Sequence, residues 1–151
     1  MRENPLLFIY KTAILLSACV NQKSLSNKNE IIEVAQYKGQ QVTGVSVTKT
    51  SRVFANFPRW REGVENSVVE VSAKGSTIPY PSKKWNQWEI EKSISDSVFV
   101  AVQSVVVHNN ELYVLDTRNL LFKGVRNAPR LFVFDLNTNS LKDIYIISQK
   151  L

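Results

Sequence analysis

One pattern of strands occurs twice along this chain, and this repeat constrains the fold most. The sequence of 151 residues aligns with itself at a period of roughly 60 residues, longer than most solenoid or propeller repeats but of the same kind. The aligned positions are Val53 with Leu112, Phe54 with Tyr113, Arg59 with Arg118, 68–71 with 131–134, and 74–75 with 137–138. The chain therefore contains two copies of one structural unit.

The clearest part of the unit is a hairpin within residues 102–119. Two apolar runs, 105–107 and 112–115, flank an Asn-rich break. Apolar, β-branched and aromatic residues on both sides of such a break predict two antiparallel strands. The second strand is expected to stop at the polar cluster that begins with Asp116. The first copy has the same form in residues 44–60.

Each unit is predicted to be a four-stranded antiparallel sheet with one long connection in its middle, like a propeller blade. The expected strands are 42–47, 52–56, 67–72 and 77–80 in the first unit, and 99–107, 111–115, 130–135 and 141–147 in the second. Residues 30–37 are predicted to form a further strand that closes the ring, with a short helix as the alternative. Residues 83–92 are predicted to form a helical turn that packs over the blade edge. The fold class is therefore all-β.

Two blades do not close a propeller, because stacked repeats usually need three or more units for stability. We therefore interpret residues 31–151 as part of a larger propeller. The missing blades are expected either downstream in a longer reading frame or on another chain. The net charge of +6 is spread along the sequence without a run of five like charges. Nucleic acid is therefore not an expected partner.

The N-terminus predicts export. Positive residues accompany a short apolar stretch that ends in Leu16-Ser17-Ala18-Cys19. A segment of this length after a positive start is typical of a secretory signal and is too short to span a membrane. The tetrapeptide resembles the lipobox of bacterial lipoproteins, in which the cysteine is lipidated. Residues 1–18 are thus predicted to be a signal peptide and 19–30 a polar tether.

Lipidation at Cys19 predicts an extracytoplasmic lipoprotein, periplasmic or at the cell surface, that a lipid anchor holds to a bacterial membrane. The alternative is an ordinary signal peptide with an incidental cysteine. Cys19 is the only cysteine in the sequence, which excludes an intramolecular disulfide.

Candidate ligand-binding residues lie where strands meet loops, because sites are often built on loops that a rigid scaffold positions. Arg59 and Trp60 are predicted to line the channel mouth, the arginine for an anion and the tryptophan for a ring. The alternative is a structural stack that locks the blade corner. Asp116 is a candidate channel acid or, alternatively, a cap for the following turn. Gln103 either faces the channel or is simply a polar strand end.

Catalytic and metal-binding patterns are missing from the sequence. His108 is the only histidine, so no ligand set for zinc exists. No Ser/His/Asp arrangement or glycine-rich phosphate loop occurs, and Asp116 alone cannot bind calcium. We therefore expect neither a metal nor a cofactor.

Several segments together resemble the major royal jelly protein/Yellow family. They are VTGVSVTKTSRVFANFPRWREGV, VVEVSAKGSTIPYP, VQSVVV, LYVLDTRN, LFKGV and APRLFVFDLNTN. The resemblance extends over residues 31–146 and the motifs occur in the family's order. It implies a secreted six-bladed β-propeller, of which this chain holds about the first two blades.

The family resemblance also implies a function. Its insect members include dopachrome-converting enzymes and amine-binding salivary proteins, and its bacterial members are described as dopachrome-tautomerase-related. We therefore expect a propeller that binds a small aromatic or amine-like molecule in its channel without turnover. The alternatives are an enzyme of the dopachrome tautomerase or sugar-lactone hydrolase type and an inactive remnant.

The chain departs from the family pattern at three places. Arg118 stands where the family has glycine, Tyr113 replaces a tryptophan, and the hairpin at 108–110 is shortened and lacks an aspartate. The first departure is the most informative, because glycine permits backbone conformations that a side chain resists.

Overall fold

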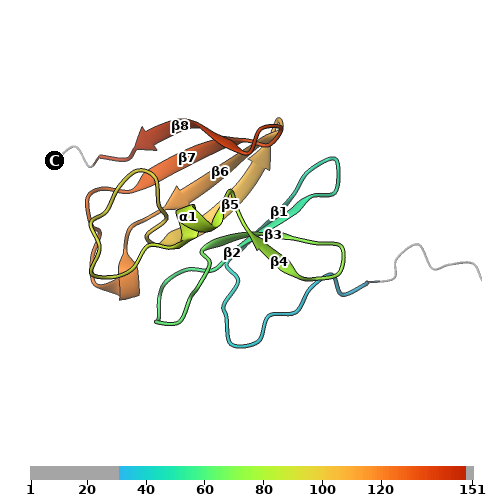
Figure 1. Ribbon diagram of the computed structural model, residues 1–151, viewed down its shortest axis with the longest axis horizontal. Helices are drawn as coiled ribbons and strands as arrows, with labels where there is room; N and C mark the ends of the chain where they lie inside the picture. The colour runs from blue at the N-terminus through green and yellow to red at the C-terminus, as the bar shows by residue number, and fades with distance from the viewer. Residues whose placement is uncertain (1–30, 149–151) are drawn as a thin grey trace, which may run out of the picture. The chain divides into compact units, whose positions relative to one another are not determined.

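The computed structural model of this chain describes residues 31–148. Its described part is all-β, with two four-stranded antiparallel sheets and little helix (Figure 1). The first sheet contains β1 (Gly44–Val47), β2 (Val53–Asn56), β3 (Val68–Val71) and β4 (Thr77–Pro79). The second contains β5 (Val102–His108), β6 (Glu111–Asp116), β7 (Arg130–Asp135) and β8 (Ser140–Ile146). All eight predicted strands are thus confirmed, within three residues at their ends.

Neighbouring strands follow the order of the sequence in both sheets. The β5–β6 hairpin turns through Asn109 and Asn110, whose φ angles of 45° and 64° lie in the left-handed region. A two-residue hairpin turn of this hand matches the natural twist of strands, and asparagine tolerates it better than most side chains. The predicted break therefore forms a tight turn, with His108 opposite Glu111.

The main core lies between the two sheets. Phe54 and Val68 come from the first sheet, and Leu112, Phe132 and Phe134 from the second; each is fully buried. Burial of such a side chain contributes about 1.5–3 kcal/mol. This core fixes one sheet against the other and thereby places their loops at common ends.

The strands β1 and β5 lie beside each other. The Thr43 hydroxyl donates to the carbonyl of Gln103 (2.9 Å), and the Ser46 hydroxyl accepts from the backbone N–H of Val107 (2.8 Å). At Gly44 a Cβ atom would lie 2.3 Å from Asn56 Oδ1 and 3.1 Å from the nitrogen of Val105. The absence of a side chain at Gly44 therefore permits this close approach.

The outer faces of the two sheets differ. Ala35, Tyr37 and Val42 pack on the outer face of the first sheet, against Ala55, Phe57, Val69 and Val71. On the second sheet, alternation along the paired strands places Val106, Tyr113 and Tyr145 on the face away from the core. Val106 and Tyr145 are each 53% exposed. This outer face is open to solvent and also carries charged groups, since the Tyr113 hydroxyl donates to Glu111 (2.7 Å) and Glu111 pairs with Lys142.

One local prediction was wrong, and another is confirmed only in part. Residues 31–37 form no strand; Ala35 and Tyr37 cross the first sheet instead, because no described strand edge pairs with this segment. The helical turn predicted over 83–92 is confined to α1 (Lys83–Asn86).

The predicted signal peptide (1–18) and tether (19–30), including Cys19, lie outside the described residues. Within 31–148, no helix has the length and apolar character needed to cross a membrane.

Candidate functional site

All four predicted ligand-binding residues belong to the same end of the sheets. Arg59 and Trp60 follow β2, Gln103 lies near the start of β5, and Asp116 ends β6. We call this the crossover end; it comprises the loops 57–67 and 117–129 and the connection 80–101. The structure joins Arg59 and Asp116 through one short segment, 99–101, to which both side chains bond.

The Arg59 side chain holds neighbouring backbone segments together inside the protein, and we call this arrangement the clamp. Its side chain is buried, with the residue only 7% exposed. The guanidinium donates to the carbonyl oxygens of Asn86 (2.6 Å), Val100 (3.2 Å) and Phe99. Burial lowers its pKa to about 10, partly opposed by the nearby charge of Asp116, which leaves the group charged at neutral pH. The structure therefore matches the alternative of a residue that locks the blade corner.

Asn86, at the end of α1, completes this clamp. Its side-chain oxygen accepts from the backbone N–H groups of Ser67 (2.8 Å) and Val68 (3.0 Å), and its amide nitrogen donates to the carbonyls of Tyr80 (3.0 Å) and Ser82 (3.1 Å). A buried amide with all these bonds joins the start of β3 to the end of the first sheet. The sequence analysis missed it, because a single asparagine between tryptophans carries no recognisable pattern.

The carboxylate of Asp116 also forms its hydrogen bonds with the backbone. Its two carboxylate oxygens accept from the N–H groups of Val100 (2.7 Å), Ala101 (2.8 Å) and Arg118 (3.0 Å), and the residue is 0% exposed. Burial raises the pKa of this carboxyl, and the three backbone donors oppose that effect. The arrangement matches the predicted alternative of a cap and leaves no exposed oxygen for a cation.

Arg118 has a backbone conformation that glycine adopts more readily than other residues. Its φ angle is 53°, in the left-handed region, and its side chain is fully buried. The guanidinium donates to Asp96 Oδ1 (2.6 Å) and to the carbonyls of Ser95 (3.2 Å) and Asn127 (3.2 Å). Arg130 Nε reaches the same Asp96 oxygen at 3.0 Å. One carboxylate thus holds two arginines beneath the loop 117–129.

Replacing Asp96 with asparagine should make the chain less sensitive to acid. Desolvation opposes ionisation of Asp96, but the hydrogen bonds from Arg118 and Arg130 outweigh it and lower the pKa of the carboxyl. A lowered folded-state pKa contributes stability above the unfolded pKa of about 4 and loses it as the pH falls through the folded value. We expect a loss of about 1 kcal/mol at neutral pH, discounted because Asp96 is partly exposed.

Urea unfolding of the two proteins at neutral pH and near pH 3 measures this difference. The wild type should lose more stability on acidification than the Asp96→Asn variant. The control is Asp143→Asn, the same change from a carboxylate to an amide at an exposed position. Equal acid responses of wild type and Asp96→Asn would contradict the assignment.

The two remaining candidates, Trp60 and Gln103, are only partly buried. Trp60 stacks on Phe122, with ring centroids 5.1 Å apart and planes inclined by 33°. Phe122 is 65% exposed, so this aromatic pair lies at the surface of the crossover end. Gln103 occupies a β-bulge in β5, and its side chain has no hydrogen-bond partner among the described residues.

A cavity of about 340 Å³ opens beside Arg59 at the crossover end. Trp88, Ile90, Leu120 and Leu121 supply its apolar lining, and Arg59, Arg61, Glu62 and Glu89 its charged groups. Arg61 donates to the carbonyl of Gly39 (2.8 Å), and Glu89 pairs with Lys92 (3.1 Å). Glu62 forms no ion pair within residues 31–148. The sequence analysis missed the cavity, because its walls come from three separate loops.

The described residues contain no group of three or more His, Cys, Asp or Glu residues that is able to hold a metal ion. No protein-family model matches the sequence, and no curated protein matches it.

Proposed function

We propose that this chain forms two adjacent blades of a β-propeller of the major royal jelly protein/Yellow type. Two sheets with the same strand order support this proposal, as do the close contact of β1 with β5 and the resemblance of the sequence motifs. The outer face of the second sheet, where Val106 and Tyr145 are half exposed, suits a surface that another blade covers. That blade belongs either to a longer form of this chain or to a partner chain.

The function that we infer is binding of a small aromatic or amine-like molecule without turnover. The cavity at the crossover end carries this proposal. It combines apolar side chains, which suit a ring, with the carboxylate of Glu62, which suits an ammonium group. Arg59 and Asp116 then contribute to ligand binding indirectly, because their hydrogen bonds hold the loops that line the cavity.

The proposal predicts that the full chain binds phenethylamine and that Glu62→Gln weakens this binding. Loss of one partly exposed charge partner is expected to reduce the affinity about fivefold. Trp88 lines the cavity, so quenching of tryptophan fluorescence provides the measurement. Ethylbenzene, which has the ring without the ammonium group, should bind more weakly.

Glu91→Gln is the matched control, because Glu91 is exposed in the connection 80–101 but does not line the cavity. Equal affinities of wild type and Glu62→Gln for phenethylamine would refute the proposed role of the carboxylate. Conversion of dopachrome or of a sugar lactone by the purified chain would instead favour the enzymatic alternative.

We also propose that the chain is an extracytoplasmic lipoprotein anchored through Cys19. The sequence Leu16-Ser17-Ala18-Cys19 after a short apolar segment supports this. Cys19→Ser should move the protein from the membrane fraction to the soluble fraction of the expressing bacterium, because the acyl chains provide the attachment. Fractionation followed by immunoblotting measures the distribution. If the variant stays in the membrane fraction to the same extent as wild type, the anchor is not at Cys19.

A further inference from the structure

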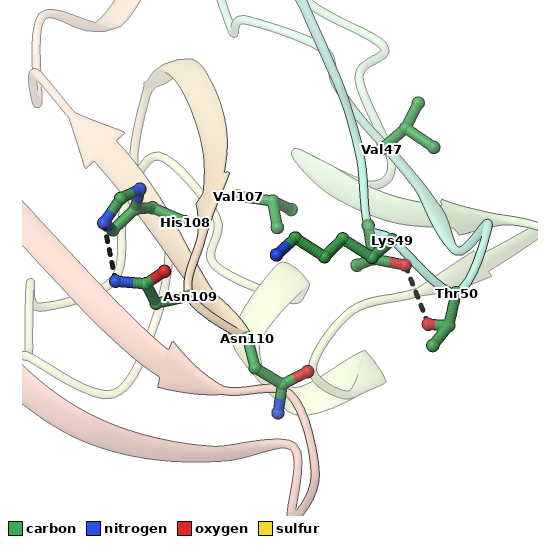
Figure 2. A pocket seen from close by; sticks show the side chains of 8 residues that line it. Val47, Lys49, Thr50, Val107, His108, Asn109 and Asn110 are labelled. Carbon is green, nitrogen blue, oxygen red and sulfur yellow. Dashed lines mark hydrogen bonds between the residues drawn. The ribbon is translucent and has the colours of Figure 1, made fainter.

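A second cavity lies at the other end of the sheets from the crossover end. It has a volume of about 560 Å³ and opens between the β1–β2 turn and the β5–β6 turn. Figure 2 shows its side chains, which come from both turns. The residues that matter here are Val47, Lys49, Thr50, Val107 and Asn110. Because the core between the sheets fixes the two turns relative to each other, the space between them is a defined feature of the fold.

The charge of this cavity is positive. Lys49 extends from the β1–β2 turn toward the β5–β6 turn, with its ammonium group in the gap (Figure 2). No aspartate or glutamate lines the cavity. Lys49 also forms no ion pair with any residue in the described part of the chain. An ammonium group without a carboxylate partner favours a negatively charged ligand.

Neutral hydrogen-bond donors accompany the ammonium group. The hydroxyl oxygens of Thr48 and Thr50 lie 3.0 Å apart and share one hydrogen bond. One of the two hydroxyl protons forms this bond, and the other is free to donate to a ligand. Asn110 is fixed in the turn, where its carbonyl accepts from Leu136 (3.0 Å). Its side-chain amide has no hydrogen-bond partner within residues 31–148 and can therefore donate to a ligand.

The wall between these groups is apolar. Val47 and Val107 line the cavity from β1 and β5, and Val47 is 56% exposed. One ammonium group matches a singly charged carboxylate better than a phosphate dianion, and the two valines suit a short branched chain. We propose that this cavity binds a small organic anion, namely a carboxylate that carries a short apolar chain. The carboxylate lies at Lys49 and the apolar chain against Val47 and Val107.

Saturation-transfer difference NMR on the full chain, with isovalerate as the probe, tests this site. The methyl groups of isovalerate should receive saturation from the protein. Isoamyl alcohol, which keeps the apolar chain but lacks the charge, should bind more weakly. Lys49→Gln should reduce the affinity for isovalerate about fivefold, since a charge-assisted hydrogen bond is strong but is screened at a partly open site.

Two further variants separate the site from general charge and folding effects. Lys74→Gln removes an exposed turn lysine that does not line the cavity and should leave binding unchanged. Asn110→Asp places a negative charge in the cavity while keeping a residue that tolerates the left-handed turn, and it should abolish binding. The proposal is overturned if wild type gives no saturation transfer, if Lys49→Gln binds like wild type, or if the alcohol binds as tightly as isovalerate.

Discussion

Replacing Asp116 with alanine should lower the free energy of unfolding by about 4 kcal/mol, because it leaves three buried backbone N–H groups without an acceptor. These groups belong to Val100, Ala101 and Arg118, at 2.7–3.0 Å from the carboxylate. The first two precede β5 and the third follows β6, so the variant should also loosen the start of the second sheet. Urea unfolding followed by tryptophan fluorescence measures the change.

Asp135→Ala is the matched control. Asp135 accepts from the N–H groups of Asn137 (2.7 Å) and Thr138 (3.0 Å) at the end of β7, in the same manner but on an exposed turn. Water can replace the lost acceptor there, so we expect a much smaller loss of stability than for Asp116→Ala. If the two alanine variants lose similar stability, burial does not explain the contribution of the Asp116 side chain to the free energy of unfolding.

The second large effect is expected for Arg59→Met, which keeps the apolar stem and removes the guanidinium. The carbonyl oxygens of Asn86, Phe99 and Val100 would lose their donor in a buried site. We expect a loss of about 3 kcal/mol, because each unsatisfied buried polar group costs about 1–3 kcal/mol while removal of a buried charge offsets part of this cost. Thermal unfolding should rank the wild type and the Arg59→Met variant in the same order of stability as urea unfolding does.

The neighbouring Arg61 provides the comparison. It donates only to the carbonyl of Gly39 and is exposed, so Arg61→Met should change the stability by less than about 0.5 kcal/mol. Wild-type stability of Arg59→Met would contradict the structural role of the guanidinium and would favour the ligand-binding interpretation of Arg59. Ligand binding in Arg59→Met should weaken together with its stability, since the clamp holds Trp88 and Leu121 indirectly.

The hairpin at 102–119 shows why the strands were predictable. Alternating apolar residues such as Val105, Leu112 and Val114 face the core, and an Asn-Asn pair turns the chain between them. Period-two burial and left-handed turn residues are local properties, so they leave a clear pattern in sequence. The strand predicted at residues 30–37 failed because a strand also requires a neighbouring edge, and local sequence does not specify one.

The candidate site was only partly predictable. Arg59 and Asp116 were chosen because they follow strands, and both prove to be buried at the crossover end. Their roles depend on partners far along the chain: Arg59 bonds to carbonyls 27–41 residues away, and Asp116 to N–H groups 15–16 residues away. No spacing rule predicts which carbonyl will lie beside a guanidinium.

The sequence by itself determined the all-β class, the repeated four-strand unit and the hairpin around the Asn-rich break, because side-chain alternation and turn preferences act over a few residues. Only the tertiary structure decided that Arg59, Asp116 and Arg118 are internal hydrogen-bonding groups and that cavities open at both ends of the sheets. The physical reason is that burial and hydrogen-bond satisfaction depend on which loops the packed core brings together.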